Sequence, residues 1–102
     1  STIYARPDGG SVSTEQLREL YRETYDQDFF IRLAEEPVEI NQVRATNFCD
    51  IYPLYDERTG RIIVLSVIDN LVKGAAGQAI QNMNVRMGWP ENMGLNAIPV
   101  VP

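Results

Sequence analysis

Apolar residues first alternate with polar residues along the chain and then recur at helical spacing. Ser1 to Arg6 alternates as a short strand does, and a Pro-Asp-Gly-Gly turn follows it. Ser13 and Gln16 have the spacing of a capping box, which predicts a helix that runs to about Tyr25. Its expected buried stripe is Leu17, Leu20, Tyr21 and Thr24. Its expected solvated face is Glu15, Arg18, Glu19, Arg22 and Glu23.

Three further runs predict strands. They are Phe29 to Leu33, Val43 to Tyr55 and Arg61 to Ile68. Pro53 lacks an N–H group, so it marks an edge or a bulge within the second run. The third run is almost continuously apolar, which is typical of a strand that is covered on both faces.

A second helix is predicted from about Leu71 to Met87, with Gly88 as its C-terminal stop. One apolar row runs along it: Leu71, Ala75, Ala79 and Met83. The Pro-rich tail from residue 89 onward is expected to be irregular, although Trp89, Leu95 and Ile98 need packing partners.

The element order β-α-β-β-β-α predicts an α/β (α+β-like) fold. We expect a two-layer domain with a mixed or antiparallel sheet and one covering helix. The second helix should leave this sheet and pack on a domain outside the chain. If it does, the apolar row should be exposed in the isolated chain.

The junction between the last strand and the second helix is the most informative segment. Asp69 and Asn70 are N-cap candidates there. Gly74 and Gly77 are poor helix formers, each costing about 1 kcal/mol relative to alanine, so a close contact should offset them. Lys73 is a cation at a helix start, which suits a bound anion such as a phosphate. A tight packing contact without a ligand explains the glycines slightly better.

Composition narrows the functional classes. Hydrophobic residues make up 44% of the 102 residues and charged residues 23%, which is ordinary for one soluble domain. The net charge of −5, without Lys or Arg clusters, argues against nucleic-acid or acidic-membrane partners. No apolar run reaches the ~20 residues of a membrane span. The start at Ser1, directly on a strand-like segment, suggests a piece of a longer protein. The single cysteine cannot form an internal disulfide, so a cytoplasmic setting is expected.

Candidate chemistry is sparse. The sequence contains no histidine, so neither a Ser-His-Asp nor a Cys-His arrangement can be built from it, and no metal-ligand spacing occurs. Cys49 lies within a predicted strand beside Asp50, which favours an inert buried thiol. Arg44 and Asn47 could bind a carboxylate or an amide, but a structural salt bridge or turn cap is the better interpretation.

Several blocks of the chain resemble the N-acetyl-gamma-glutamyl-phosphate reductases. One block covers residues 66–84 (SVIDNLVKGAAGQAIQNMN), and its part from Asp69 to Asn84 is quite specific; related aspartate-semialdehyde dehydrogenases have other residues after Lys-Gly-Ala-Ala. Residues 43–51 (VRATNFCDI), 56–61 (DERTGR) and 13–21 also match. So does the ending, Gly94-Leu95 followed by Ile98-Pro99. The resemblance therefore covers nearly the whole chain.

This resemblance implies an NADP-dependent reduction of N-acetylglutamyl phosphate to N-acetylglutamate semialdehyde, in arginine biosynthesis. The family forms a thioester on a cysteine that a histidine assists, and both belong to motifs outside this chain. Cys49 matches a non-catalytic position. The chain alone is therefore expected to be inactive and to supply no catalytic residue and no metal ligand.

The resemblance also implies a division of the chain. Residues 1–69 would be part of the substrate and dimerisation domain, and residues 70–102 would be the C-terminal helix and tail that return to the Rossmann domain. That missing domain would bind most of the NADP, and a homo-oligomer would form through the sheet. The cofactor-proximal residues would be Asn70, Lys73, Gly74, Ala75 and Gly77, with Asn70 the best candidate for a polar contact.

Two alternatives remain. The chain could be a self-contained dimerisation or ligand-binding module without catalysis. It could also be part of a related acyl-phosphate reductase, of the aspartate-semialdehyde or lysine-pathway type.

Overall fold

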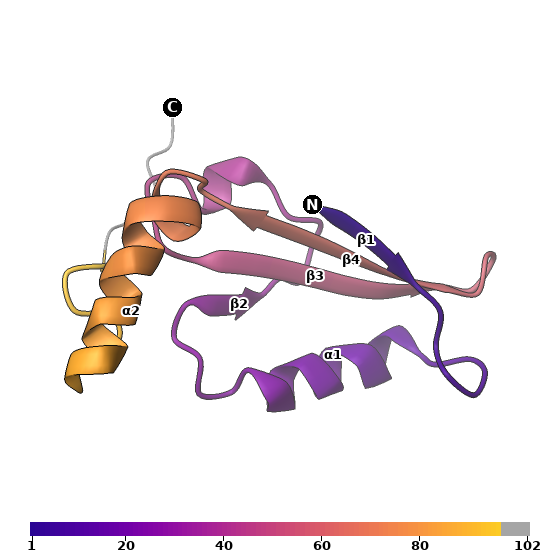
Figure 1. Ribbon diagram of the computed structural model, residues 1–102. Coiled ribbons are helices and arrows are strands. Elements are labelled where there is room, and N and C mark those ends of the chain that lie inside the picture. Colours follow the sequence, from indigo (N-terminus) through magenta and orange to yellow (C-terminus); the bar gives the residue numbers. More distant parts are fainter. Residues whose placement is uncertain (97–102) are drawn as a thin grey trace.

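The computed structural model describes residues 1–96 and contains one mixed sheet and two α-helices (Figure 1). The strands pair in the order β1-β4-β3-β2, with β2 parallel to β3 and the other pairs antiparallel. The elements are β1 (Thr2–Ala5), α1 (Thr14–Thr24), β2 (Ile31–Leu33), the 3₁₀-helix η1 (Ile40–Gln42), β3 (Cys49–Asp56), β4 (Arg61–Ile68), the π-helical turn η2 (Val72–Ala76) and α2 (Gly77–Met87). The predicted element order and α/β class are confirmed.

Helix α1 covers one face of the sheet. Ser13 and Gln16 form the predicted capping box at its start. Near its C-terminal end, Tyr21 and Tyr25 face Ile31 and Ile51 across a cavity of about 150 Å³. The molecule is only 18 Å across in its thinnest direction, as expected for a two-layer fold.

The side of α1 that meets the sheet differs from the prediction. Leu17 is buried and Tyr21 half-buried, but Leu20 is 56% exposed. Arg18 was expected on the solvated face, yet only 13% of its side chain is exposed and its Nη2 lies 3.0 Å from Glu35. A long arginine side chain can bury its alkyl part while its charged end meets a carboxylate, so a simple apolar stripe does not identify this face.

The predicted strand from Val43 to Tyr55 is wrong in its first half. Residues 43–48 form a turn, and β3 begins only at Cys49. The Thr46 hydroxyl donates to the Val43 carbonyl at 2.6 Å, and Ala45 has a positive φ of 61°. Because β2 and β3 are parallel, the chain between them must return across the sheet, and this turn ends that crossover.

Pro53 lies where no neighbouring strand needs its N–H group. Along β3, Cys49 donates to the Phe30 carbonyl and Tyr55 donates to the Thr14 hydroxyl, both on the side away from β4. Pro53 has the same orientation, but β2 ends before it. The prediction of a sheet edge at Pro53 is therefore confirmed.

The second face of the sheet lacks a covering helix over its centre, within residues 1–96. The strand register places five apolar side chains together on this open face: Tyr4, Tyr52, Leu54, Ile63 and Leu65. Tyr4 is exposed and the other four are half-buried. The expectation that Arg61–Ile68 is covered on both faces is thus not met among residues 1–96.

The second helix begins and ends as predicted, but its first turn is π-helical. Gly88 ends α2 in the left-handed conformation with φ 74°. The buried Asn84 then donates to the carbonyl oxygens of Glu91 and Met93, both at 3.0 Å, which holds the following turn against α2. Leu95 is buried there, whereas Trp89 is 43% exposed, and Ile98 lies outside the described residues.

Neither α-helix in residues 1–96 has the length and hydropathy needed to cross a bilayer.

Candidate functional site

Asp69 caps the junction between β4 and η2. Its Oδ1 accepts from the Leu71 N–H at 2.9 Å, and its Oδ2 accepts from the Ala45 N–H at 2.7 Å. These contacts, first that with Ala45 and then that with Leu71, hold the pKa of Asp69 below its ordinary value. Asp69, one of the two cap candidates, thus accepts from the backbone just before η2, although the residue at the N-cap position is Leu71, which has no side-chain cap. The Asp69 carboxylate also ties the junction to the loop before β3.

The turn that follows is wider than an α-helical turn. Gly74 donates to the Asp69 carbonyl at 3.2 Å and Ala76 donates to the Leu71 carbonyl at 3.3 Å, so each bond spans five residues. Gly77 donates to the Val72 carbonyl with the same spacing. Such π-helical turns are rare and occur frequently at functional sites.

The predicted cofactor-proximal residues divide into two groups. Asn70, Gly74 and Ala75 are exposed, whereas Lys73 is half-buried and Gly77 is buried. Asn70 lines a cleft of about 300 Å³ between the junction and η1, together with Ile40, Asn41, Arg44, Asp69 and Leu71. The exposed group is therefore available to a ligand or to another domain.

Lys73 points into the protein and does not face the exposed helix start. Its Nζ donates to Gln81 Oε1 at 2.7 Å and lies 5.5 Å from the centre of the Phe30 ring. Burial lowers the pKa of Lys73, and the nearby Cys49 and Glu91 oppose that shift. Gln81 in turn donates to Glu91 at 3.1 Å. Lys73 thus belongs to an internal polar network.

Gly77 is explained by close packing. A Cβ atom on Gly77 would lie 2.6 Å from both the carbonyl oxygen and Cγ1 of Val72, and it would also meet the side-chain oxygen of Asn47. By contrast, a Cβ atom on Gly74 would meet Ile68 Cδ1 at an ordinary 3.4 Å. The packing explanation that the sequence left open therefore applies to Gly77 but not to Gly74.

Asn47 is the residue that the sequence undervalued. Its side chain is 1% exposed, and its Nδ2 donates to Gln81 Oε1 at 2.9 Å. Its Oδ1 is buried without a hydrogen-bond partner among residues 1–96. The sequence indicates Asn47 as a residue that could bind a carboxylate or an amide, and in the structure its amide partner is Gln81 of the same chain.

The other candidate residues carry little chemistry of their own. Cys49 is half-buried with its Sγ 3.4 Å from the Ser66 hydroxyl, in keeping with a structural thiol. Arg44 is exposed and forms no ion pair within residues 1–96, although its charge contributes to the lowered pKa of Asp69. No group of His, Cys, Asp or Glu in that part of the chain could hold a metal ion.

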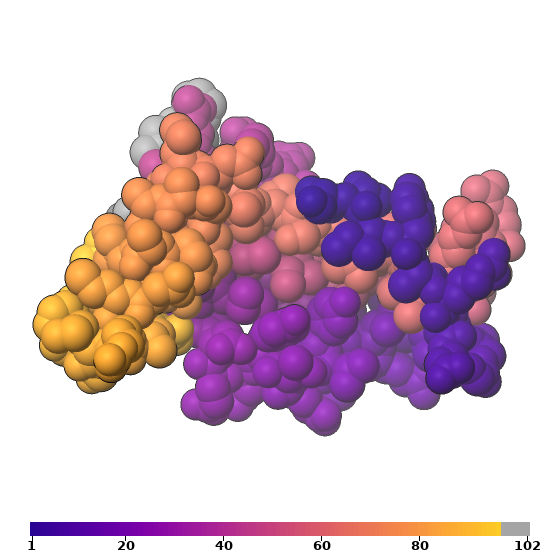
Figure 2. Space-filling view, viewed as in Figure 1, coloured from indigo at the N-terminus to yellow at the C-terminus, as the bar shows by residue number. Residues whose placement is uncertain are grey.

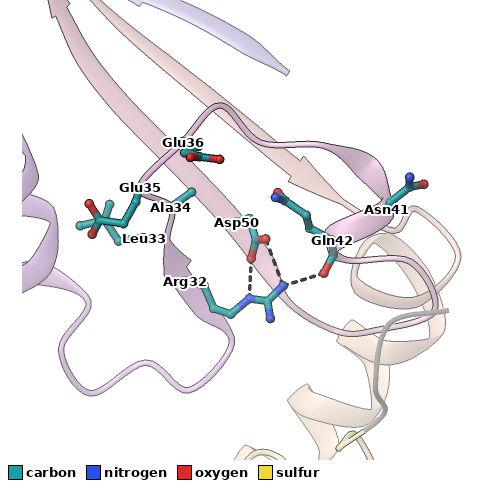
Figure 3. Close-up of a pocket in the computed structure, with 8 residues that line it drawn as sticks. All are labelled: Arg32, Leu33, Ala34, Glu35, Glu36, Asn41, Gln42 and Asp50. Atoms are coloured by element: carbon teal, nitrogen blue, oxygen red, sulfur yellow. Dashed lines mark hydrogen bonds and ion pairs between the residues drawn. The ribbon is translucent and has the colours of Figure 1, made fainter. Parts of the chain in front are cut away.

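A hollow of about 640 Å³ lies elsewhere, beside β2 and η1 (Figure 3). Arg32 occupies it, donating to the two Asp50 carboxylate oxygens at 2.6 and 3.0 Å and to the Gln42 carbonyl at 2.7 Å. The guanidinium group also lies 4.2 Å from the centre of the Phe48 ring. These partners already bind the guanidinium group, so Arg32 holds the crossover in place and is poorly suited to bind an anion in the hollow.

The apolar row on the second helix is exposed. Leu71 is 80% and Met83 50% exposed, and Ala75 and Ala79 between them are also exposed. Figure 2 shows α2 and its following turn protruding at one end of the molecule, beside the sheet layer. A contiguous exposed apolar surface of this kind is typical of an interaction site.

Comparisons with known proteins agree on one family. The model of the semialdehyde dehydrogenase dimerisation domain matches residues 1–70. Over its full length the chain is 53% identical to an N-acetyl-gamma-glutamyl-phosphate reductase of Citrifermentans bemidjiense, 50% identical to one of Geobacillus sp. and 47% identical to one of Dehalococcoides mccartyi. The chain spans about 30% of the length of each of these relatives.

Proposed function

Because the chain belongs to the semialdehyde dehydrogenase dimerisation-domain family, we propose that it is the C-terminal portion of an NADP-dependent N-acetyl-gamma-glutamyl-phosphate reductase. The complete enzyme would convert N-acetylglutamyl phosphate to N-acetylglutamate semialdehyde in the cytoplasm, as a step of arginine biosynthesis. Residues 1–69 would belong to the substrate and dimerisation domain. Residues 70–102 would form the helix and tail that return to the cofactor domain.

The observation that best supports this proposal is the exposed junction beside an exposed apolar row. Asn70, Gly74 and Ala75 face outward where η2 begins, and the row from Leu71 to Met83 continues along the same helix. The row would dock on the Rossmann domain, which would bring the junction close to the cofactor held there. A self-contained module would be expected to cover such a row.

Asn70 would make the polar contact at this junction. Its amide offers both a donor and an acceptor, which suits the carboxamide of a nicotinamide ring. Gly74 and Ala75 would let the ring approach the backbone closely. Lys73 and Gly77 would hold the shape of the turn from within, through Gln81 and Val72. NADPH would supply the hydride, and the rest of the enzyme would supply the nucleophilic thiol and the proton carrier.

The open face of the sheet would form the contact between two copies. Tyr4, Ile63 and Leu54 lie side by side across three strands, as do Leu65 and Tyr52 across two. Burial of such a surface stabilises association by roughly 25 cal/mol per Å² of apolar area, before the entropy lost on association.

The reaction is tested on the complete protein with NADPH and three acyl phosphates. These are N-acetylglutamyl phosphate, aspartyl phosphate and the carrier-linked substrate of the lysine pathway. We expect turnover of N-acetylglutamyl phosphate with a kcat/KM at least 100-fold above the others. We also expect Cys49→Ser to retain activity, because serine can keep the contact with Ser66. Preference for another acyl phosphate would reject the substrate, and loss of activity in Cys49→Ser would reject the assignment of the thiol.

A further inference from the structure

The buried loop before β3 contacts the β4–helix junction on both sides of its π-helical turn. On one side, Ala45 donates to Asp69, three residues before η2 begins. On the other side, Asn47 donates to Gln81 and presses its Oδ1 against Gly77, the residue that follows η2. We define Ala45 and Asn47, with these contacts, as the two-point clamp.

The clamp is rigid. Val43, Thr46 and Asn47 are almost completely buried, and the Thr46 hydroxyl donates to Val43 and accepts from the Phe48 N–H. Such a loop cannot move without breaking several hydrogen bonds at once. It is therefore suited to fixing the position of whatever it touches.

The turn needs such support. A π-helical turn is rare, and nothing in the run Val-Lys-Gly-Ala-Ala favours it over an ordinary α-helical turn. The Asn47 side chain occupies the space that a Cβ atom on Gly77 would need, and its own Oδ1 is buried without a hydrogen-bond partner in the described part of the chain. A buried polar atom left unsatisfied calls for an explanation, and contact with the end of η2 provides one.

We propose that Asn47 is a positioning residue for the dinucleotide. It touches no ligand itself. Through Gln81 and Gly77 it fixes η2, and η2 sets the outward positions of Asn70 and Gly74. This inference rests on the proposed function, since it assumes that the junction meets NADPH.

The test uses the complete enzyme and steady-state kinetics with NADPH as the varied substrate. Asn47→Ala is expected to raise the KM for NADPH by about tenfold, because a misplacement of about 1 Å can cost up to 100-fold. Gln81→Met removes the anchor of Asn47 without removing Asn47, and it should raise the same KM. Asn82→Ala changes an exposed asparagine on the same helix and should leave the KM unchanged. Thermal melts establish whether each variant is folded at the assay temperature. If Asn47→Ala is not folded there, the KM of Gln81→Met decides the test of the positioning role.

Measuring Asn47→Ala in protein that already carries Asn70→Ala separates a positioning role of Asn47 from an effect on stability alone. If Asn47 acts through Asn70, then Asn47→Ala should add little to the KM once Asn70 is alanine, whereas its effect on the melting temperature should persist. A raised KM in Asn70→Ala alone, with Asn47→Ala and Gln81→Met normal, would overturn the positioning role and leave the proposed function intact. If Asn70→Ala also has normal kinetics, then the junction is not the cofactor site, and the positioning role of Asn47 is rejected as well.

Discussion

Gly77→Ala should destabilise the protein, although alanine is the better helix former. The new Cβ atom would lie 2.6 Å from both the carbonyl oxygen and Cγ1 of Val72, and it would meet the Asn47 oxygen. Relief requires a backbone shift of η2 or a rotation of Asn47 away from Gln81. Overpacking of this kind costs about 1–3 kcal/mol. Loss of the Asn47–Gln81 hydrogen bond would add about 1 kcal/mol, and helix propensity would return about 1 kcal/mol. The expected net loss is therefore about 1–3 kcal/mol.

Thermal unfolding of the complete protein measures this loss. Each kcal/mol lowers the melting temperature of a domain of 150–250 residues by about 2–4 °C. Gly74→Ala is the matched control, because its Cβ atom meets only ordinary contacts and the turn gains a better helix former. It should melt at or slightly above the temperature of the parent protein. A Gly77→Ala variant as stable as the parent would refute the close contact with Asn47 and Val72.

Three further predictions concern the sheet, the cap and the exposed turn. Leu65→Arg on the open face should shift the complete protein toward monomers in sedimentation velocity, whereas Leu20→Arg on the exposed side of α1 should not; equal behaviour would remove the open face from the interface. Asp69→Asn should melt below the parent at pH 7. Because the pKa of Asp69 is lowered in the folded state, its stabilising effect is present above its ordinary pKa of about 4 and is lost as the pH falls through the folded-state pKa, so the two melting temperatures should converge once the pH is below the folded-state pKa; a pH-independent difference would contradict the cap. Gly74→Ala should keep its stability but raise the KM for NADPH about tenfold, and unchanged kinetics would mean that no ring approaches this backbone.

Local sequence signals predicted most of the elements. The Ser13–Gln16 box, the apolar run of β4 and the Gly88 stop each act within a few residues, and each holds in the structure. The missing N–H group of Pro53 also indicated its edge position correctly, because that constraint is local.

The errors came from contacts between distant segments. Residues 43–46 alternate like a strand, but the backbone of residues 43–48 serves a crossover whose path depends on β2 lying parallel to β3. Arg18 looked solvated because its partner, Glu35, lies 17 positions further along the chain. Lys73 looked available to an anion because its partner, Gln81, lies a full two turns along the same helix. The spacing of residues within one or two turns does not reveal these contacts, because the partners lie in different elements or two full turns apart.

Three departures from local preference meet at one place in this molecule, whereas the buried Arg18 Nη2 on α1, which has no hydrogen-bond partner among residues 1–96, lies elsewhere. Ala45 adopts a left-handed conformation, η2 is π-helical, and Asn47 buries an oxygen that has no hydrogen bond to residues 1–96. All three meet at the β4–helix junction. Elsewhere the caps and turns agree with the fold. Strain persists where the surrounding structure over-determines it, and it clusters at sites that bind or react. The same junction presents Asn70 and the exposed apolar row to the outside, so the strain and the accessible chemistry coincide. A junction with only a structural role would need the close packing but not the exposed side chains. The coincidence of strain and exposure is therefore the strongest physical argument that the junction contacts a partner beyond these residues.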